Sequence, residues 1–285
     1  MGSPVYFGVA GWSYPDWAGI VYPPSLKPSD QLPYLARFVD MIEVNSSFYR
    51  VPTPKTVEGW LKKTEQFPAF FFTAKVPEAV THRGETSTEA AGAFREAFTP
   101  LIEAGRLRQL LAQFRWDFSD SPASRGLLER LVDLYSRSAP VVIEVRHNSW
   151  QASTGLSFLA SLGVTVANLD MPLSTTSFNL AESRIGEDAY VRLHGRNRKA
   201  WFDKLAGRDE TYDYLYSPEE LAQLQARVLA IRQSAKSITV VANNHFRGKE
   251  VANTLELKAL LTGTKIEAPP GLVHEYPRLR EIVRG

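Results

Sequence analysis

Residues 141–150 read Val-Val-Ile-Glu-Val-Arg-His-Asn-Ser-Trp, a β-branched run that passes directly into polar side chains. The apolar part predicts a buried strand. Because successive strand side chains point to opposite faces, Glu144 and Arg146 share one face with Val142, while the other face is aliphatic. Charges on a buried strand are costly unless they meet partners, a ligand or water. The stretch therefore predicts a core strand whose end carries a polar site.

Strand patterns of this kind recur along the chain, and most are followed by a helical pattern. One helix start is marked by Ser217-Pro218-Glu219-Glu220, which combines a capping box with proline in its favoured place. Eight strand–helix units in 285 residues predict a single (β/α)8 TIM-type barrel domain over residues 1–285. An open doubly wound sheet is the alternative, although no glycine-rich phosphate loop follows any strand. The predicted strands cover residues 5–10, 41–44, 70–75, 110–113, 141–145, 164–168, 189–193 and 238–242.

The composition favours a globular protein with a sizeable core. The chain is 44% hydrophobic, carries a net charge of +2 and contains no cysteine. That charge is too small to imply a nucleic-acid or membrane partner by itself, and the lack of cysteine excludes disulfides and thiolate chemistry. No signal-peptide pattern is present, and no apolar run approaches the roughly 20 residues of a membrane helix. We therefore expect a cytoplasmic protein.

Polar side chains gather at the ends of the predicted strands. In TIM barrels the active site is built at the C-terminal ends of the strands. Alternation along the strands directs one set of side chains into the mouth and the aliphatic set toward the helices. At the end of the eighth strand, either Asn243 or Asn244 supplies this group. The expected substrate-binding residues are Lys75, Arg146, Arg192, Asn45, Gln113, Trp12, Tyr49, His147, Trp150 and Asn244.

Carboxylates at the same strand ends suggest acid–base chemistry. Glu43 and Glu144 are a candidate pair of the kind used in glycoside hydrolysis, with one acid and one base or nucleophile. His194 is a candidate general acid or base because its reference pKa lies near neutrality. Together with Asp170, these residues predict an enzyme, a hydrolase acting on a sugar- or phosphate-containing substrate. The substrate would be a small anionic or sugar-like molecule.

A structural ion-pair network is an alternative to catalysis, because the carboxylates and cations at the strand ends are equal in number. The interleaved lysine and arginine side chains oppose a cluster of metal ligands, and no HExxH-like spacing is present. We therefore expect no bound metal and no cofactor. The matched charges are Glu43, Glu144 and Asp170 against Lys75, Arg146 and Arg192.

A basic and aromatic stretch offers a second functional hypothesis. Residues 192–204, RLHGRNRKAWFDK, interleave cations with aromatic rings. Late loops of TIM barrels often bind phosphate, and cations with aromatic rings also suit single-stranded nucleic acid. The protein would then be a non-catalytic binding module for an anionic ligand or nucleic acid.

Six segments in order along the chain carry a family resemblance: GWSYPDWAGIVYP, IEVNSSFYRVPTPKTVEGW, FFFTAKVPEAVTH, EVRHNSW, YVRLHGRN and VANNHFRGKEVANTLELKALL. Together they resemble the YecE-like family, which is classed as domain of unknown function number seventy-two. The resemblance implies a single (β/α)8-type barrel and no established activity. The family usually has Gln-Phe-Pro-Pro after the fourth strand. Gln113-Phe114-Arg115-Trp116 replaces it here and adds a cation and an indole near the mouth.

Overall fold

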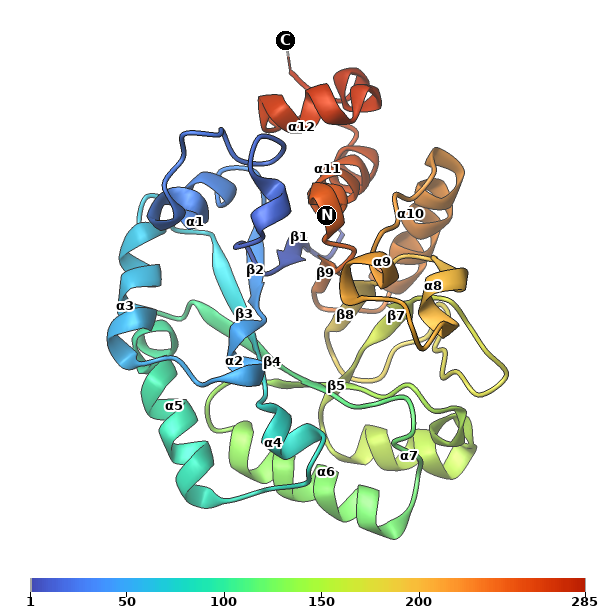
Figure 1. Ribbon diagram of the computed structural model, residues 1–285. Helices are drawn as coiled ribbons and strands as arrows, with labels where there is room; N and C mark the ends of the chain where they lie inside the picture. Colours follow the sequence, from blue (N-terminus) through green and yellow to red (C-terminus); the bar gives the residue numbers. More distant parts are fainter. Residues whose placement is uncertain (1, 285) are drawn as a thin grey trace.

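Nine parallel strands form one nearly closed sheet in the computed structural model, which describes residues 2–284 (Figure 1). The strand order is β6-β5-β4-β3-β2-β1-β9-β8-β7, so that β1 and β9 from the two ends of the chain are paired. This arrangement confirms the predicted barrel and excludes the open doubly wound sheet. The strands are β1 (Val5–Ala10), β2 (Met41–Val44), β3 (Phe71–Lys75), β4 (Leu107–Gln113), β5 (Val141–Glu144), β6 (Thr165–Val166), β7 (Asn168–Asp170), β8 (Ala189–Leu193) and β9 (Ile238–Ala242).

Helices alternate with the strands and surround the sheet (Figure 1). The predicted capping box is present at the start of α10, where the Ser217 side chain accepts from the Glu220 backbone N–H and the Glu220 carboxylate accepts from Ser217 N. The helices are α1 (Gln31–Leu35), α2 (Ser46–Tyr49), α3 (Pro54–Lys63), α4 (Glu78–Thr81), α5 (Thr88–Glu103), α6 (Pro122–Tyr135), α7 (Ser153–Ser161), α8 (Arg198–Phe202), α9 (Arg208–Thr211), α10 (Pro218–Arg232), α11 (Lys249–Thr262) and α12 (Pro270–Glu275). None of the helices within residues 2–284 has the length and apolar character needed to cross a membrane.

The predicted strand at residues 164–168 is divided into β6 and β7, and the second part continues to Asp170. β6 pairs with β5, whereas β7 pairs with β8. Ala167 lies between them, and its backbone N–H donates to Ile143 O at 2.9 Å. The chain therefore leaves one neighbouring strand and joins the other within a single residue. This exchange of partners is the place where the sheet nearly closes.

Side-chain alternation divides the core into a layer inside the barrel and layers between the sheet and the helices. The inner layer includes Met41, Phe71 and Val142. The residues next to them along each strand, such as Ile42 and Ile143, pack toward the helices. Alternation therefore carries Glu43, Lys75, Glu144 and Arg192 into the barrel, as the sequence predicts. These polar side chains lie above the apolar inner layer, toward the C-terminal ends of the strands.

A long connection between β8 and α10 contacts the mouth of the barrel. It contains α8 and α9, which lie beside each other near the ends of β7 and β8 (Figure 1). The ring of Trp201 lies 5.8 Å from that of His194, and the ring of Tyr212 lies 5.4 Å from that of His245. We call residues 196–216 the mouth loop. It provides part of the wall of both cavities described below.

Candidate functional site at the barrel mouth

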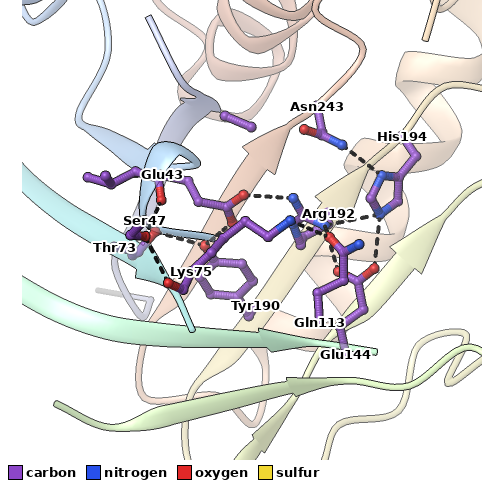
Figure 2. Close-up of polar contacts among 12 residues, drawn as sticks. Glu43, Ser47, Thr73, Lys75, Gln113, Glu144, Tyr190, Arg192, His194 and Asn243 are labelled. Atoms are coloured by element: carbon purple, nitrogen blue, oxygen red, sulfur yellow. Dashed lines mark hydrogen bonds and ion pairs between the residues drawn. The ribbon is translucent and has the colours of Figure 1, made fainter. Parts of the chain in front are cut away.

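Arg192 joins two carboxylates that come from separate strands (Figure 2). Its Nη2 donates to Glu43 Oε1 at 2.7 Å, and its Nη1 donates to Glu144 Oε2 at 2.6 Å. Glu43 lies on β2, Glu144 on β5 and Arg192 on β8, and all three side chains are fully buried. A single guanidinium therefore links three strands, none of which is a direct neighbour of another.

Both carboxylates have further donors. Tyr190 Oη donates to Glu43 Oε2 at 2.8 Å, and Arg146 Nη2 donates to Glu144 Oε1 at 2.6 Å. Burial by itself would raise the pKa of Glu144, but the positive charges of Arg192 and Arg146 hold it well below its ordinary value. Glu144 is therefore an anion at neutral pH, and its oxygens are occupied by arginine donors.

Lys75 differs from the arginines because it has no carboxylate partner. Its Nζ donates to Gln113 Oε1 at 3.1 Å and lies 4.3 Å from the centre of the Phe48 ring. No Asp or Glu oxygen within residues 2–284 lies close enough to form an ion pair with it. Burial lowers the pKa of Lys75 to about 7, and the positive charge of Arg192 acts in the same direction. Lys75 is therefore divided between its charged and neutral forms near neutral pH.

His194 is fully buried beside the same cluster. Its Nδ1 lies 3.1 Å from Asn243 Nδ2, and its Nε2 lies 3.3 Å from Arg192 Nη1. Nε2 lies 3.5 Å from Glu144 Oε1. Burial lowers the pKa of His194 to about 4, despite the nearby Glu144 charge. The imidazole is therefore neutral at pH 7, and it adds no positive charge to the site.

A polar cavity of about 260 Å³ opens above Lys75. It is smaller than the roughly 300–1,000 Å³ of sites for drug-sized ligands, so it suits a small molecule. Asn45 Oδ1 is buried and accepts no hydrogen bond from any described residue. Arg208, also in the wall, forms no ion pair with residues 2–284. The wall consists of Asn45, Phe48, Tyr49, Lys75, His82, Gln113, Arg208, Tyr212 and Asn243.

A larger cavity of about 520 Å³ has Tyr212 in its wall as well, so the two cavities share a boundary. Its wall contains two cations, Arg146 and Lys204, and no carboxylate. Trp116, from the position where the family usually has proline, is 69% exposed and lies at this cavity. The expected indole near the mouth is therefore present. The other wall residues are Met171, Ser174, Thr176, Ser177, Trp201, Phe202 and Thr211.

Most of the predicted site residues come together at these cavities or beneath them. Trp12 lies farther out: it packs edge-to-face on Trp60 at 5.4 Å and lines a small cavity with Asn45 and Tyr49. Tyr49 is 71% exposed and belongs to the rim. The predicted residues that the structure brings together are Glu43, Asn45, Tyr49, Lys75, Gln113, Glu144, Arg146, Arg192 and His194.

Asp170, expected in the mouth as a catalytic residue, points away from it. Arg196 binds both of its oxygens at 2.9 and 2.8 Å, and Tyr216 Oη donates to Oδ1 at 2.7 Å. In the alternating run of residues 164–170 it shares the outward face with Val164 and Val166, which precede β7 and pack toward the helices. The same alternation rule, applied to those two valines, predicts the outward orientation of Asp170.

Three predicted binding residues also have other positions. Trp150 is fully buried, and its Nε1 donates to Phe118 O at 2.8 Å. His147 Nδ1 accepts from Ser149 N at 3.2 Å and caps a short helical turn. Asn244 is fully buried, and its Nδ2 donates to Tyr214 O at 2.7 Å on the helix side. Asn243, which was the alternative at this strand end, lies in the mouth instead.

Some mouth residues were missing from the prediction. Tyr190 stands two residues before Arg192 on β8, so alternation places it on the same inner face, and this signal was available in the sequence. Arg208 and Tyr212 come from the mouth loop, whose path no local pattern specifies. No group of three or more His, Asp or Glu side chains among residues 2–284 is arranged to hold a metal ion.

Comparison with known proteins supplies the family context of this site. The sequence model of the family described as "Protein of unknown function DUF72" matches residues 6–274. The UPF0759 protein YunF of Bacillus subtilis (strain 168) is 26% identical over 272 residues, which are 90% of this chain and 94% of that protein.

Solved structures agree with this match. A DUF72 family protein of Thermotoga maritima MSB8 is 33% identical with a TM-score of 0.80, covering 91% of this chain and 99% of that one. D-psicose 3-epimerase of Clostridium cellulolyticum H10 has a TM-score of 0.51 at 8% identity, covering 98% and 100%. The second likeness concerns the barrel fold alone.

Proposed function

The chain belongs to the DUF72 family of proteins of unknown function, and from this premise we propose that it is an enzyme acting on a small sugar- or phosphate-containing substrate at the barrel mouth. The observation that carries the proposal is the environment of Lys75. A buried amine without an ion-pair partner is costly to maintain, and here it faces a polar cavity. Strongly perturbed ionisable groups in a cleft are typical of catalytic sites.

The charge balance supports an anionic substrate. Arg146, Arg192 and protonated Lys75 outnumber the two buried carboxylates, Glu43 and Glu144. Arg208 adds a further cation to the cavity wall. Arginine and lysine donors stabilise phosphate and developing negative charge. Hydroxyl groups of the substrate have hydrogen-bonding partners in the side-chain amides of Asn45 and Asn243.

The contacts favour a different division of roles from the carboxylate pair that the sequence suggests. Glu144 stays ionised and is bound by two arginines, which is unfavourable for a proton donor. Lys75 is the group whose pKa of about 7 suits proton transfer at neutral pH. We therefore assign acid–base chemistry to Lys75, and assign to Glu43 and Glu144 the positioning of Arg192. Hydrolysis remains a reaction class to be tested.

Calorimetry and ³¹P NMR test this proposal with glycerol 3-phosphate, dihydroxyacetone phosphate and their phosphate-free parents. We expect the phosphorylated compounds to bind more tightly, and Lys75→Met or Arg208→Gln to weaken binding about 10–100-fold, as expected for lost charged hydrogen bonds. Turnover of at least one sugar phosphate, visible as a change in the phosphorus spectrum, should disappear in Lys75→Met. Lys204→Gln, in the larger cavity, is the matched control and should keep both properties.

The alternative, a non-catalytic module for an anionic ligand or nucleic acid, is favoured by the larger cavity. Its wall combines Arg146 and Lys204 with Trp116, Trp201 and Phe202. This alternative predicts that a short oligothymidylate binds with strong salt dependence, that Lys204→Gln weakens it and that Lys75→Met does not. Such a result, without turnover of any sugar phosphate, would replace the enzyme proposal.

A further inference from the structure

We infer that Lys75 is a nucleophile that forms an imine with the carbonyl carbon of an open-chain sugar or sugar phosphate. This inference rests on the proposed function and names its substrate class. It goes beyond proton transfer, because it assigns a covalent bond to the lysine nitrogen. Lysine amines with lowered proton affinity are the usual partners of carbonyl substrates in enzymes.

The backbone around Lys75 is held firmly. Lys75 is the last residue of β3, its carbonyl oxygen accepts from Ser47 Oγ at 2.8 Å, and the next residue, Val76, donates its N–H to Leu111 O at 2.9 Å. Lys75 is 9% exposed and lies in the wall of the polar cavity, and Figure 2 shows its side chain extended toward Gln113 and Arg192. A nucleophile on a strand end is positioned more precisely than one on a loop.

A structural role does not account for an unpaired amine at this place. The buried cation beside it, Arg192, is bound to two carboxylates, and Arg146 is bound to one of them. Lysines elsewhere in the fold have partners when they are partly buried, as Lys258 has in Asp40. Within residues 2–284 Lys75 instead has the amide oxygen of Gln113 and the face of the Phe48 ring.

The Gln113 contact suits an amine in its neutral form. A neutral amine still donates an N–H to Gln113 Oε1, and its lone pair remains for another atom. Gln113 Oε1 also accepts from Arg192 Nη1 at 3.1 Å, so its position is fixed from the other side. At pH 7 a lysine whose pKa is about 7 has a neutral fraction ~10³-fold larger than one with the reference pKa near 10.4.

The cavity wall fits the remainder of such a substrate. Asn45 and Asn243 bring side-chain amides to the wall, and amide groups pair with sugar hydroxyls. Arg208 offers donors for a phosphate. Asn243 Nδ2 offers a donor for the carbonyl oxygen. The volume of about 260 Å³ favours a short chain over an oligosaccharide. The inferred substrate is therefore a short polyhydroxy aldehyde or ketone, with or without a phosphate.

The chemical step balances without an oxidant or reductant. The lone pair of neutral Lys75 Nζ forms a bond to the carbonyl carbon, and the carbonyl π electrons move to the oxygen. One amine proton passes to that oxygen and gives a carbinolamine. Protonation of its hydroxyl group releases water as the C–N double bond forms. The sum is amine plus carbonyl plus one proton, giving a protonated imine and water.

Borohydride trapping tests the inference. The intact protein is incubated at pH 7 with dihydroxyacetone phosphate and sodium borohydride, which reduces an imine to a stable secondary amine. We expect one adduct per chain by mass spectrometry, with peptide mapping placing it on Lys75. Lys75→Arg keeps the positive charge and should lower the amount of adduct at least about tenfold. The exposed lysines that remain are protonated at pH 7 and therefore react slowly. Lys258→Arg, at a partly buried lysine that is paired with Asp40 outside the mouth, is the matched control and should form the adduct normally.

Calorimetry with glycerol 3-phosphate, which lacks a carbonyl group, separates the two proposals. Binding of this compound without any trapped adduct, or with adducts spread over exposed lysines, overturns the imine and leaves the proposed function standing. Absence of both binding and trapping overturns both. Mapping of the adduct in the unmodified sequence does not depend on a variant, so the test holds even if Lys75→Arg folds poorly.

Discussion

The buried charges at the mouth stabilise one another only as a complete set. Glu43, Glu144 and Arg192 are all fully buried, and such charges are costly unless each has a partner with good geometry. Arg192 meets this condition with distances of 2.7 and 2.6 Å. Removing one charge leaves another buried without compensation. The carboxylates therefore contribute to the stability of the barrel whatever their part in chemistry.

Glu144→Gln should lower the free energy of unfolding by about 3–5 kcal/mol, the usual effect of removing one partner from a buried ion pair. Glutamine keeps the shape of the side chain but leaves Arg192 and Arg146 with one carboxylate fewer. Urea denaturation followed by circular dichroism measures the change. The control is Glu85→Gln, because Glu85 forms an exposed ion pair with Arg83. This variant should have the same free energy of unfolding as the parent protein. Equal stability of Glu144→Gln and the parent would contradict a stabilising role for these buried ion pairs.

Several residues of the mouth were predictable one by one. Strand alternation directs Glu43, Lys75, Glu144 and Arg192 into the barrel. Each of them stands two residues after another inward-facing residue of the same strand. The pairing among them was not predictable. Sequence suggests six charges that cancel, yet Asp170 belongs to a different cluster, and Lys75 is left without a carboxylate. Pairing depends on distances across the barrel, which no single strand encodes.

At the scale of elements, β7 holds the mouth loop in position. Asp170 at the end of β7 binds Arg196 at the start of the loop and Tyr216 at its end. Gly195 N also donates to Tyr216 Oη at 3.0 Å, so the two ends of the loop meet at one carboxylate. Asp170, which the sequence suggests as a catalytic residue, thus attaches the mouth loop to β7. Its contacts affect the shape of both cavities through the loop.

Asp170→Asn should loosen the mouth loop without unfolding the barrel. Loss of charged hydrogen bonds, worth about 1.5–3 kcal/mol, corresponds to roughly 10–100-fold faster amide exchange in residues 196–216. Hydrogen–deuterium exchange with peptide mapping measures this effect, and α5 on the far side should keep its protection. Asp209→Asn, at an exposed position in the same loop, is the matched control. Uniform acceleration over all helices would instead indicate a global loss of stability.

For the whole molecule, the mouth cluster connects strands that are distant in the sheet order. Contacts among Glu43, Lys75, Gln113, Glu144 and Arg192 join β2, β3, β4, β5 and β8. Electrostatic changes at the mouth therefore reach most of the barrel. Burial lowers the pKa of His194 and that of His245 to about 4, which makes both imidazoles neutral in the folded protein.

The folded protein should lose stability on acidification from about pH 6.5 to 4. In this window the unfolded chain protonates His194, whereas the folded protein does not, so the free energy of unfolding falls as the pH falls. A pKa of about 4 against a reference near 6.5 corresponds to about 3 kcal/mol for this residue. The loss contributed by Glu144 follows at lower pH, because its pKa is held below the ordinary value.

Chemical denaturation at a series of pH values checks this expectation. His194→Asn should lose about 3 kcal/mol less than the parent protein between pH 6.5 and 4, because it removes one titrating group. His274→Asn removes an exposed histidine and serves as the control. Parallel pH profiles of His194→Asn and the parent would contradict the assignment of a buried neutral imidazole.

The sequence by itself determined the barrel, the family and the inward set of strand-end side chains, because hydrophobic alternation and strand–helix order are local properties of the chain. Only the tertiary structure decided that Glu43 and Glu144 share Arg192, that Asp170 faces outward to the mouth loop and that Trp150 lies in the core. It also decided that Lys75 has no carboxylate partner and faces a small polar cavity. These facts depend on strand register and on the path of a long loop, which bring together residues as far apart as Glu43 and Arg192.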